Sequence, residues 1–333
     1  MSKQTKPLNT SLLSLIQLIG AILVIALHCR RLFDNEQLHF IQKSIFSRMV
    51  VPFFMVSASF FIHRNYPTIS KHYLIHYSKQ YLIWSAVYLP FFIGYLYLEQ
   101  IPFLYYPLAA LVGLIYTGIS YQLWYMPAFL TGLLLVHFSL KKWGWRITTC
   151  LASTLYLLGT IETYSSYLSE TPLLYAYNHY KTIFFTSRNG LFYAPIFVLT
   201  GFFLSHKLNQ PIFQHQLKPK LLFFLVCFGI EGHFIFLNQG YDKNFFFSLV
   251  PFIAYFVAWV LTTDIFYSQK FHYLKSYASY YYFIHVIPLE LSFFLLKSSH
   301  LTISQQGWSV FFITVATSHT FAYLFIKYSK KTL

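Results

Sequence analysis

Long apolar runs, separated by short polar loops, constrain this chain more than any other feature of its sequence. A helix needs about 20 apolar residues to cross the hydrocarbon core of a bilayer, and only 10% of the 333 residues are charged. We predict transmembrane helices over 8–28, 45–62, 80–98, 122–140, 147–161, 189–206, 219–237, 244–266, 274–297 and 307–326. The chain is therefore expected to be all-α and polytopic, with about ten transmembrane helices in a single integral domain over residues 1–333 and no attached soluble domain.

A further apolar segment, 101–120, does not read as a regular span. Pro102, Pro107 and Gly118 interrupt it, and irregular backbone at membrane depth is tolerated only where protein or water surrounds it. We expect a broken or re-entrant segment buried among helices. If the segment spans the bilayer instead, the count becomes eleven and the topology changes.

Basic residues are divided unequally between the two sides of the predicted membrane. With the N-terminus inside, sixteen Lys and Arg residues fall in inner segments and six in outer loops, while Arg48 and Lys297 lie near helix ends, which accounts for all 24. Because cytoplasmic loops carry the excess of Lys and Arg, both termini and the 63–79 segment are predicted to be cytoplasmic, with 29–44 and 162–188 external. The net charge of +15 then suits an anionic inner membrane leaflet and does not indicate nucleic-acid binding.

The cysteines and histidines do not predict a metal centre. The three cysteines, Cys29, Cys150 and Cys227, lack the spacing of a zinc site or of a disulfide framework. No two histidines at the predicted outer face share a metal-ligand spacing. We therefore expect neither a bound metal nor a bound cofactor.

Polar residues within the apolar spans are costly, so each is a candidate functional residue. The candidates, with their aromatic neighbours, are Gln17, His28, Arg48, Trp124, Tyr125, Arg188, Asn189, Glu231, His233, His285 and Glu290. Most fall toward the outer face, which predicts an outward-facing pocket of imidazole, guanidinium, carboxylate and aromatic groups. Alternatively, Trp124 and Tyr125 belong to an interfacial aromatic belt, and the arginines extend to the outer headgroups.

Two of these candidates suggest particular chemistry. A carboxylate at the depth of Glu231 should be protonated or face a cation, which Arg48, Arg188 or His233 could supply. We predict that Glu231 lies close to the two arginines. His28 is the candidate proton carrier, because an imidazole can take a proton from a hydroxyl and return it to a leaving thiolate near neutral pH. Composition and spacing alone predict only a membrane protein with an outward polar site.

Five segments occur in a characteristic order and spacing: LIGAILVIALHC, SRMVVPFFMVSASFFI, SYQLWYMPAFLTGLLL, SRNGLFYAPIFVLTGFFL and SYASYYYFIHVIPLELS. Over nearly the whole chain this pattern resembles the acyltransferase 3 family of bacterial multi-spanning membrane acyltransferases. The second and fourth segments most resemble the branch that includes the membrane part of vancomycin-resistance serine racemases. The resemblance implies a ten-helix fold.

The resemblance also implies which residues act. His28 matches the family's first-span histidine, Arg48 its second-span arginine, and Arg188 and Asn189 the start of its RNG segment. The family's arginine eleven positions before that histidine is replaced here by Gln17, whose amide cannot supply positive charge. We predict catalytic roles for His28, Arg48 and Glu231, and substrate-binding roles for the other candidates.

The activity implied is transfer of an acyl group, commonly acetyl from acetyl-CoA, to a carbohydrate or other cell-envelope acceptor. His28 would act as general base or carry the acyl group, while an arginine would stabilise the oxyanion or bind an acidic acceptor. Many relatives carry an extracellular esterase-like domain, whereas this chain ends at Leu333. We therefore expect either independent action or a separate extracytoplasmic partner protein.

The rival hypothesis is a transporter or binding protein for a small, amino-acid-like molecule. The racemase-like branch is associated with supply of a small amino acid, and Gln17 removes part of the usual catalytic pattern. Six prolines inside predicted spans would also suit broken helices around a site at the membrane midplane; they are Pro52, Pro90, Pro127, Pro195, Pro251 and Pro288. The sequence identifies neither the acceptor nor the acyl chain.

Overall fold

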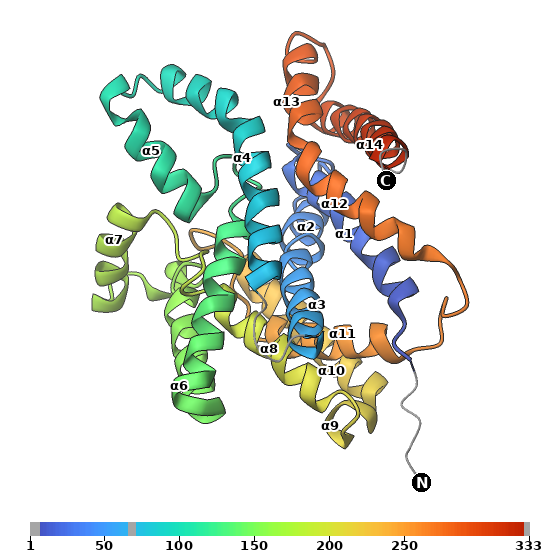
Figure 1. The fold of residues 1–333 in the computed structure, drawn as a ribbon. Coiled ribbons are helices and arrows are strands. Elements are labelled where there is room, and N and C mark those ends of the chain that lie inside the picture. Colours follow the sequence, from blue (N-terminus) through green and yellow to red (C-terminus); the bar gives the residue numbers. More distant parts are fainter. Residues whose placement is uncertain (1–6, 66–70, 330–333) are drawn as a thin grey trace. The chain divides into compact units, whose positions relative to one another are not determined.

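The computed structural model describes residues 7–65 and 71–329, which fold into helices joined by turns and short loops (Figure 1). The α-helices are α1 (Thr10–His28), α2 (Glu36–Phe40), α3 (Val50–Asn65), α4 (Lys71–Leu98), α5 (Tyr106–Val112), α6 (Tyr125–Thr160), α7 (Pro172–Phe184), α8 (Ala194–Lys207), α9 (Pro211–Gln214), α10 (Leu217–Leu237), α11 (Leu249–Thr262), α12 (Leu274–Ile284), α13 (Val286–Leu295) and α14 (Ile303–Ser329). Shorter 3₁₀ or π segments cover Ile41–Phe46, Phe103–Tyr105, Gly113–Thr117, Ser165–Leu168 and Phe271–Tyr273. These two ranges contain no β-strand, so the all-α prediction is confirmed.

Two compact units divide the chain. The first unit comprises 1–50, 216–223 and 255–333, and the second unit comprises 51–215 and 224–254. Each unit combines segments that are distant in the sequence.

Within the described ranges, five helical stretches are long and apolar enough to cross a membrane. They are Thr10–His28, Glu36–Asn65, Tyr73–Leu98, Leu217–Leu237 and Ile303–Tyr328. Each coincides with a predicted span, which is consistent with a membrane protein. The other predicted spans fall on helices shorter than 18 residues or on parts of α6.

Helix α6 contains a reversal of chain direction at Gly144. The ring of Tyr193 lies 5.8 Å from Trp124, which precedes α6, and 6.3 Å from Tyr156 near the end of α6. In a straight helix those two positions would be about 48 Å apart, so the two parts of α6 must fold back on each other. Gly144 permits the turn with φ of 72° and ψ of −177°, a conformation that is essentially restricted to glycine. The predicted spans 122–140 and 147–161 are the two arms of this hairpin.

Close packing between α6 and α8 holds the second unit together. A Cβ atom at Gly132 of α6 would lie 2.7 Å from the Cβ of Ala194, at the start of α8. Small residues of this kind let two helix backbones approach closely where lipid offers no hydrophobic driving force. Beside this contact, the buried rings of Tyr156, Phe197 and Phe245 cluster within 5.7 Å of one another or of Tyr193.

Helices α1, α12, α13 and α14 form the core of the first unit (Figure 1). Its buried side chains include Ile25 of α1, Tyr281 of α12, Leu289 of α13 and Val310 of α14. The span predicted over 274–297 is divided within this core into α12 and α13. Pro288, in the first turn of α13, has no backbone N–H to continue the helix ladder, and this explains the interruption.

The segment 101–120 is broken, as predicted, but its first part, 101–112, is mostly exposed, whereas Gly113, Gly118 and Ile119 in its second part are buried. The side chains of Phe103 and Leu104 are 81% and 83% exposed. Its helical pieces are each seven residues or shorter, and such short pieces cannot cover a full apolar face against a neighbouring helix. The expectation that helices bury this segment is therefore wrong for 101–112 and holds in part for 113–120.

Candidate functional site

The predicted site residues fall into two groups, one in each unit. The first unit holds Gln17, His28, Arg48, His285 and Glu290, and the second holds Trp124, Tyr125, Arg188, Asn189, Glu231 and His233. Glu290 and His233 are exposed, on α13 and α10 respectively. The structure therefore brings together only parts of the predicted set.

In the first unit, His28 and His285 form a stacked pair. Their ring centroids are 5.4 Å apart and their planes differ by 21°. His28 is the last residue of α1, and His285 is the single residue between α12 and α13. The imidazole of His285 therefore lies at the break between α12 and α13, where it stacks on the imidazole of His28.

The hydrogen bonds of His285 define its tautomer. Its Nδ1 lies 2.9 Å from the carbonyl oxygen of Tyr281 and 2.9 Å from that of Tyr282. Because a carbonyl oxygen can only accept, Nδ1 must carry the hydrogen, and Nε2 of the neutral ring is then an acceptor. His285 is completely buried and its Nε2 has no hydrogen-bond partner.

The other candidates of the first unit lie at different positions along its helices. Gln17 is half-buried on α1 and its Oε1 is buried without a partner. It lies eleven residues before His28, which is about 16 Å along a helix. The two side chains are therefore too far apart to bind the same small group. Arg48 is half-buried in the turn before α3, directly after Ser47, whose hydroxyl donates to the carbonyl of Leu23 at 3.1 Å.

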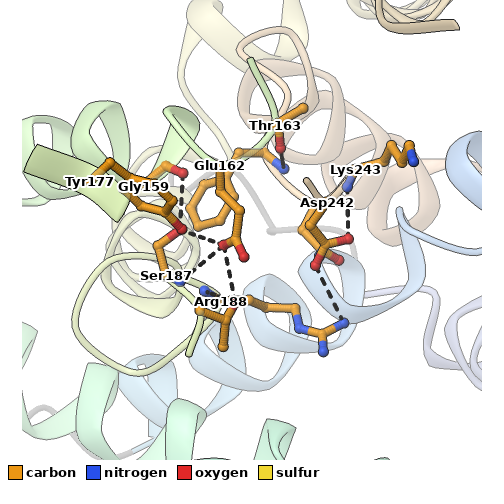
Figure 2. A network of polar contacts seen from close by, with 11 residues as sticks. Gly159, Glu162, Thr163, Tyr177, Ser187, Arg188, Asp242 and Lys243 are labelled. Carbon is orange, nitrogen blue, oxygen red and sulfur yellow. Dashed lines mark hydrogen bonds and ion pairs between the residues drawn. The ribbon is translucent and has the colours of Figure 1, made fainter. Parts of the chain in front are cut away.

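In the second unit, the loop before α8 is attached to the end of α6 by Glu162. Oε2 of this carboxylate accepts hydrogen bonds from the Ser187 amide at 2.9 Å, the Ser187 hydroxyl at 2.6 Å and the Thr186 hydroxyl at 3.0 Å (Figure 2). Glu162 is only 3% exposed. Hydrogen bonds from three donors to one buried carboxylate oxygen hold the loop firmly in place.

Ser187 is the centre of this network. Its hydroxyl receives a hydrogen bond from the Tyr177 hydroxyl at 3.3 Å and also lies 3.0 Å from the carbonyl oxygen of Gly159 (Figure 2). Burial raises the pKa of Tyr177, so this phenol stays protonated and acts as a donor. The loop is therefore fixed to α6 and α7 by groups that are all in use.

Arg188 projects from this fixed loop. Its guanidinium carbon lies 4.7 Å from the centre of the Trp124 ring. Its Nη1 lies 3.9 Å from Oδ2 of Asp242 (Figure 2). Its Nε is buried without a partner. Two of the candidate residues, Arg188 and Trp124, therefore contact each other, and the arginine keeps donor capacity for a ligand.

Asn189 and Tyr125 have local structural contacts. The Asn189 amide nitrogen donates to the Tyr116 hydroxyl at 2.8 Å, and its Oδ1 accepts from the amides of Leu191 and Phe192. These bonds order the turn into α8. The Tyr125 ring stacks on Phe129 one helical turn later, with ring centroids 5.7 Å apart.

Glu231 has partners other than the predicted cation. Its carboxylate accepts hydrogen bonds from the Tyr164 hydroxyl and from the Phe247 backbone amide, the latter at 2.5 Å. It also accepts hydrogen bonds from Ser248, from the backbone amide at 2.8 Å and from the hydroxyl. It forms no ion pair with Arg188, which faces Asp242 instead, so the prediction of that pair is wrong. The amides at the start of α11 supply the partial positive charge that we had assigned to an arginine. The predicted pairing with Arg48 joins different units and stays a prediction.

Sequence reasoning missed Glu162, Ser187 and Tyr177. Glu162 and Ser187 are 25 residues apart and no periodic pattern connects them. One signal was available, because the chain has only nine acidic residues and Glu162 directly follows an apolar run.

Comparison with known proteins gives a consistent result. A family model for acyltransferase 3, described as an acyltransferase domain, matches residues 12–327. An amino-acid racemase of Enterococcus faecalis is 28% identical over 231 residues, which is 67% of this chain and 32% of the relative. A serine/alanine racemase of Enterococcus gallinarum is 31% identical over 229 residues, which is 63% of this chain and 30% of the relative. The chain thus spans about a third of the length of these relatives, and no solved structure matches it.

Proposed function

This chain belongs to the acyltransferase 3 family, and on that basis we propose that it moves an acyl group, in the first place acetyl, from cytoplasmic acyl-CoA to a hydroxyl group at the outer membrane face. The acceptor is an envelope polysaccharide, a glycolipid or a similar molecule. The observation that carries the proposal is the family match over residues 12–327, within which His28 ends a helix long and apolar enough to span a membrane.

The reaction requires one proton to move from the acceptor to the donor. The acceptor oxygen bonds to the thioester carbonyl carbon, the carbon–sulfur bond breaks, and the hydroxyl proton finally reaches the thiolate. His28 handles this proton as general base or carries the acyl group between the two substrates. Arg48 stabilises the negative charge that develops on the carbonyl oxygen.

Arg188 suits the acceptor side of the reaction. Its loop is held by Glu162 and its guanidinium lies over the Trp124 ring, so its direction is set before a substrate arrives. The unpartnered Nε and the long 3.9 Å separation from Asp242 leave donors for an anionic or oxygen-rich group. We therefore assign acceptor binding to Arg188.

Sealed inside-out vesicles test the proposal. Vesicles that contain the protein should consume labelled acetyl-CoA from the medium and place alkali-labile ester label in the envelope fraction. His28→Ala should lower this transfer by about 10²- to 10⁴-fold, whereas His215→Ala, which changes an exposed histidine beyond α9, should not. Equal transfer by His28→Ala and the unchanged protein would remove the proposed catalyst.

The second candidate is transport or binding of a small amino-acid-like molecule. The names of the relatives refer to amino acids, and the break between α12 and α13 is of the kind that transporters place at binding sites. The same vesicles separate the two functions. Uptake of a labelled amino acid without any ester product would favour the transporter.

A further inference from the structure

One of the stacked histidines, His285, has a hydrogen-bond acceptor atom, Nε2, to which the proposed function assigns no role. His285 Nε2 is completely buried, carries a lone pair because Nδ1 holds the hydrogen, and has no partner. Most buried polar atoms in proteins have a partner, so one that lacks a partner calls for an explanation, and a catalytic role is one such explanation. The ring that contains it lies 5.4 Å from that of His28.

We propose that the two histidines divide the reaction, with His28 carrying the acyl group and His285 Nε2 acting as the general base for the acceptor hydroxyl. This inference rests on the proposed function and decides between the two roles open to His28. A nitrogen that is acylated cannot take up a proton at the same time, so the second step needs another base. His285 supplies one with its lone pair already directed by the carbonyls of Tyr281 and Tyr282.

The two steps balance. In the first, a neutral His28 ring nitrogen bonds to the thioester carbonyl carbon and the carbon–sulfur bond breaks, which releases the thiolate and leaves a positively charged acyl-imidazolium on His28. In the second, the acceptor oxygen bonds to the same carbon, the nitrogen–carbon bond breaks, and the hydroxyl proton passes to His285 Nε2. That proton then leaves for the thiolate, which gives one ester and one thiol for each hydroxyl and thioester used.

Labelling without an acceptor tests this division. The purified full chain in detergent is mixed with acetyl-labelled acetyl-CoA, and protein-bound label that neutral hydroxylamine releases is measured. The unchanged protein and His285→Gln should both become labelled, and His28→Ala should not. When envelope fraction is added, the label should leave His285→Gln about 10²- to 10⁴-fold more slowly than the unchanged protein, since the glutamine amide accepts a hydrogen bond but not a proton.

The outcomes distinguish the alternatives. An active unchanged protein that never becomes labelled overturns the acyl-His28 step, and fast release of label from His285→Gln overturns the assigned base. A purely structural His285 would make labelling, transfer and thermal stability fall together, and His285→Phe provides a second measure of that behaviour. If no variant consumes acetyl-CoA in vesicles or detergent, the proposed function itself fails, which is a different result from normal consumption without a labelled enzyme.

Discussion

The polar groups around Glu162 and those around His285 are both buried, but their hydrogen bonding differs. Glu162 Oε2 has three donors, and Ser187 beside it has contacts with Tyr177 and Gly159. His285 is satisfied on one edge of its ring and has no partner on the other. A saturated network fixes the chain, whereas an unsaturated atom beside a second functional ring leaves a place that a substrate can fill.

The difference has a thermodynamic consequence. A buried donor left without an acceptor costs about 1–3 kcal/mol of folding stability. Substitutions around Glu162 should therefore reduce stability, whereas substitutions at His285 should reduce turnover. Each prediction below compares stability with transfer, measured as the unfolding temperature in detergent and as ester formation in vesicles.

The largest effect is expected for Glu162→Ala. The change leaves the Ser187 amide and the hydroxyls of Ser187 and Thr186 without their common acceptor, so the free energy of unfolding should fall by about 2–4 kcal/mol. Glu99→Ala, at an exposed carboxylate after α4, should leave the unfolding temperature nearly unchanged. Equal unfolding temperatures for the two variants would show that the network does not stabilise the loop.

A smaller loss is expected for Ser187→Ala. The variant removes the acceptor of the Tyr177 hydroxyl but keeps the hydrogen bond from the backbone N–H of residue 187 to Glu162. The free energy of unfolding should therefore fall by about 1–2 kcal/mol. Ser279→Ala is the matched control, because that exposed hydroxyl bonds only to the carbonyl of its own helix at Lys275. A Ser187→Ala protein of normal stability but without transfer would assign Ser187 to the chemistry instead.

Glu231→Gln should cost about 1 kcal/mol. The amide keeps one acceptor oxygen but loses the negative charge beside the first amides of α11, and its NH₂ group faces the donors at Ser248. Transfer per folded molecule should change by only a few-fold, since the contacts of Glu231 are structural. Loss of transfer with normal stability would restore the catalytic role that we predicted from the sequence.

The smallest stability effect is expected for His285→Phe. A phenyl ring of similar shape removes the unpartnered Nε2 together with the Nδ1 hydrogen, so the free energy of unfolding should change by less than about 1 kcal/mol. Transfer should nevertheless be lost. A stability loss as large as that of Glu162→Ala would mean that His285 is a structural residue and would remove the contrast between the two regions.

The sequence predicts the helices well because apolar run length is a local property. The runs at 8–28 and 219–237 correspond to α1 and α10 almost residue for residue. The break between α12 and α13 has a cause visible in the sequence, Pro288, but the exposure of 101–112 has none, because exposure depends on what packs against a segment. Burial is a tertiary property that run length does not report.

The candidate site was predicted less completely for the same reason. His28 and His285 were both identified from their cost in an apolar span, yet their stacking depends on where α1 meets the end of α12. Glu231 was identified correctly as a carboxylate that needs compensation, but the start of α11 provides it. Residue type therefore predicted the need for a partner, and only the fold identified which partner meets it.

The turn at Gly144 makes the handedness of the amino acid a measurable variable. Nothing lies within 4 Å of a Cβ atom built there, so space alone would admit alanine. The φ of 72° strains L-alanine by about 1–3 kcal/mol. The same backbone conformation is an ordinary one for D-alanine. A protein assembled with D-alanine at 144 should match or exceed the stability of the glycine protein, because the methyl group also restricts the unfolded chain. The hairpin of α6 therefore depends on a residue at 144 that can adopt a positive φ, and not on the space around that residue.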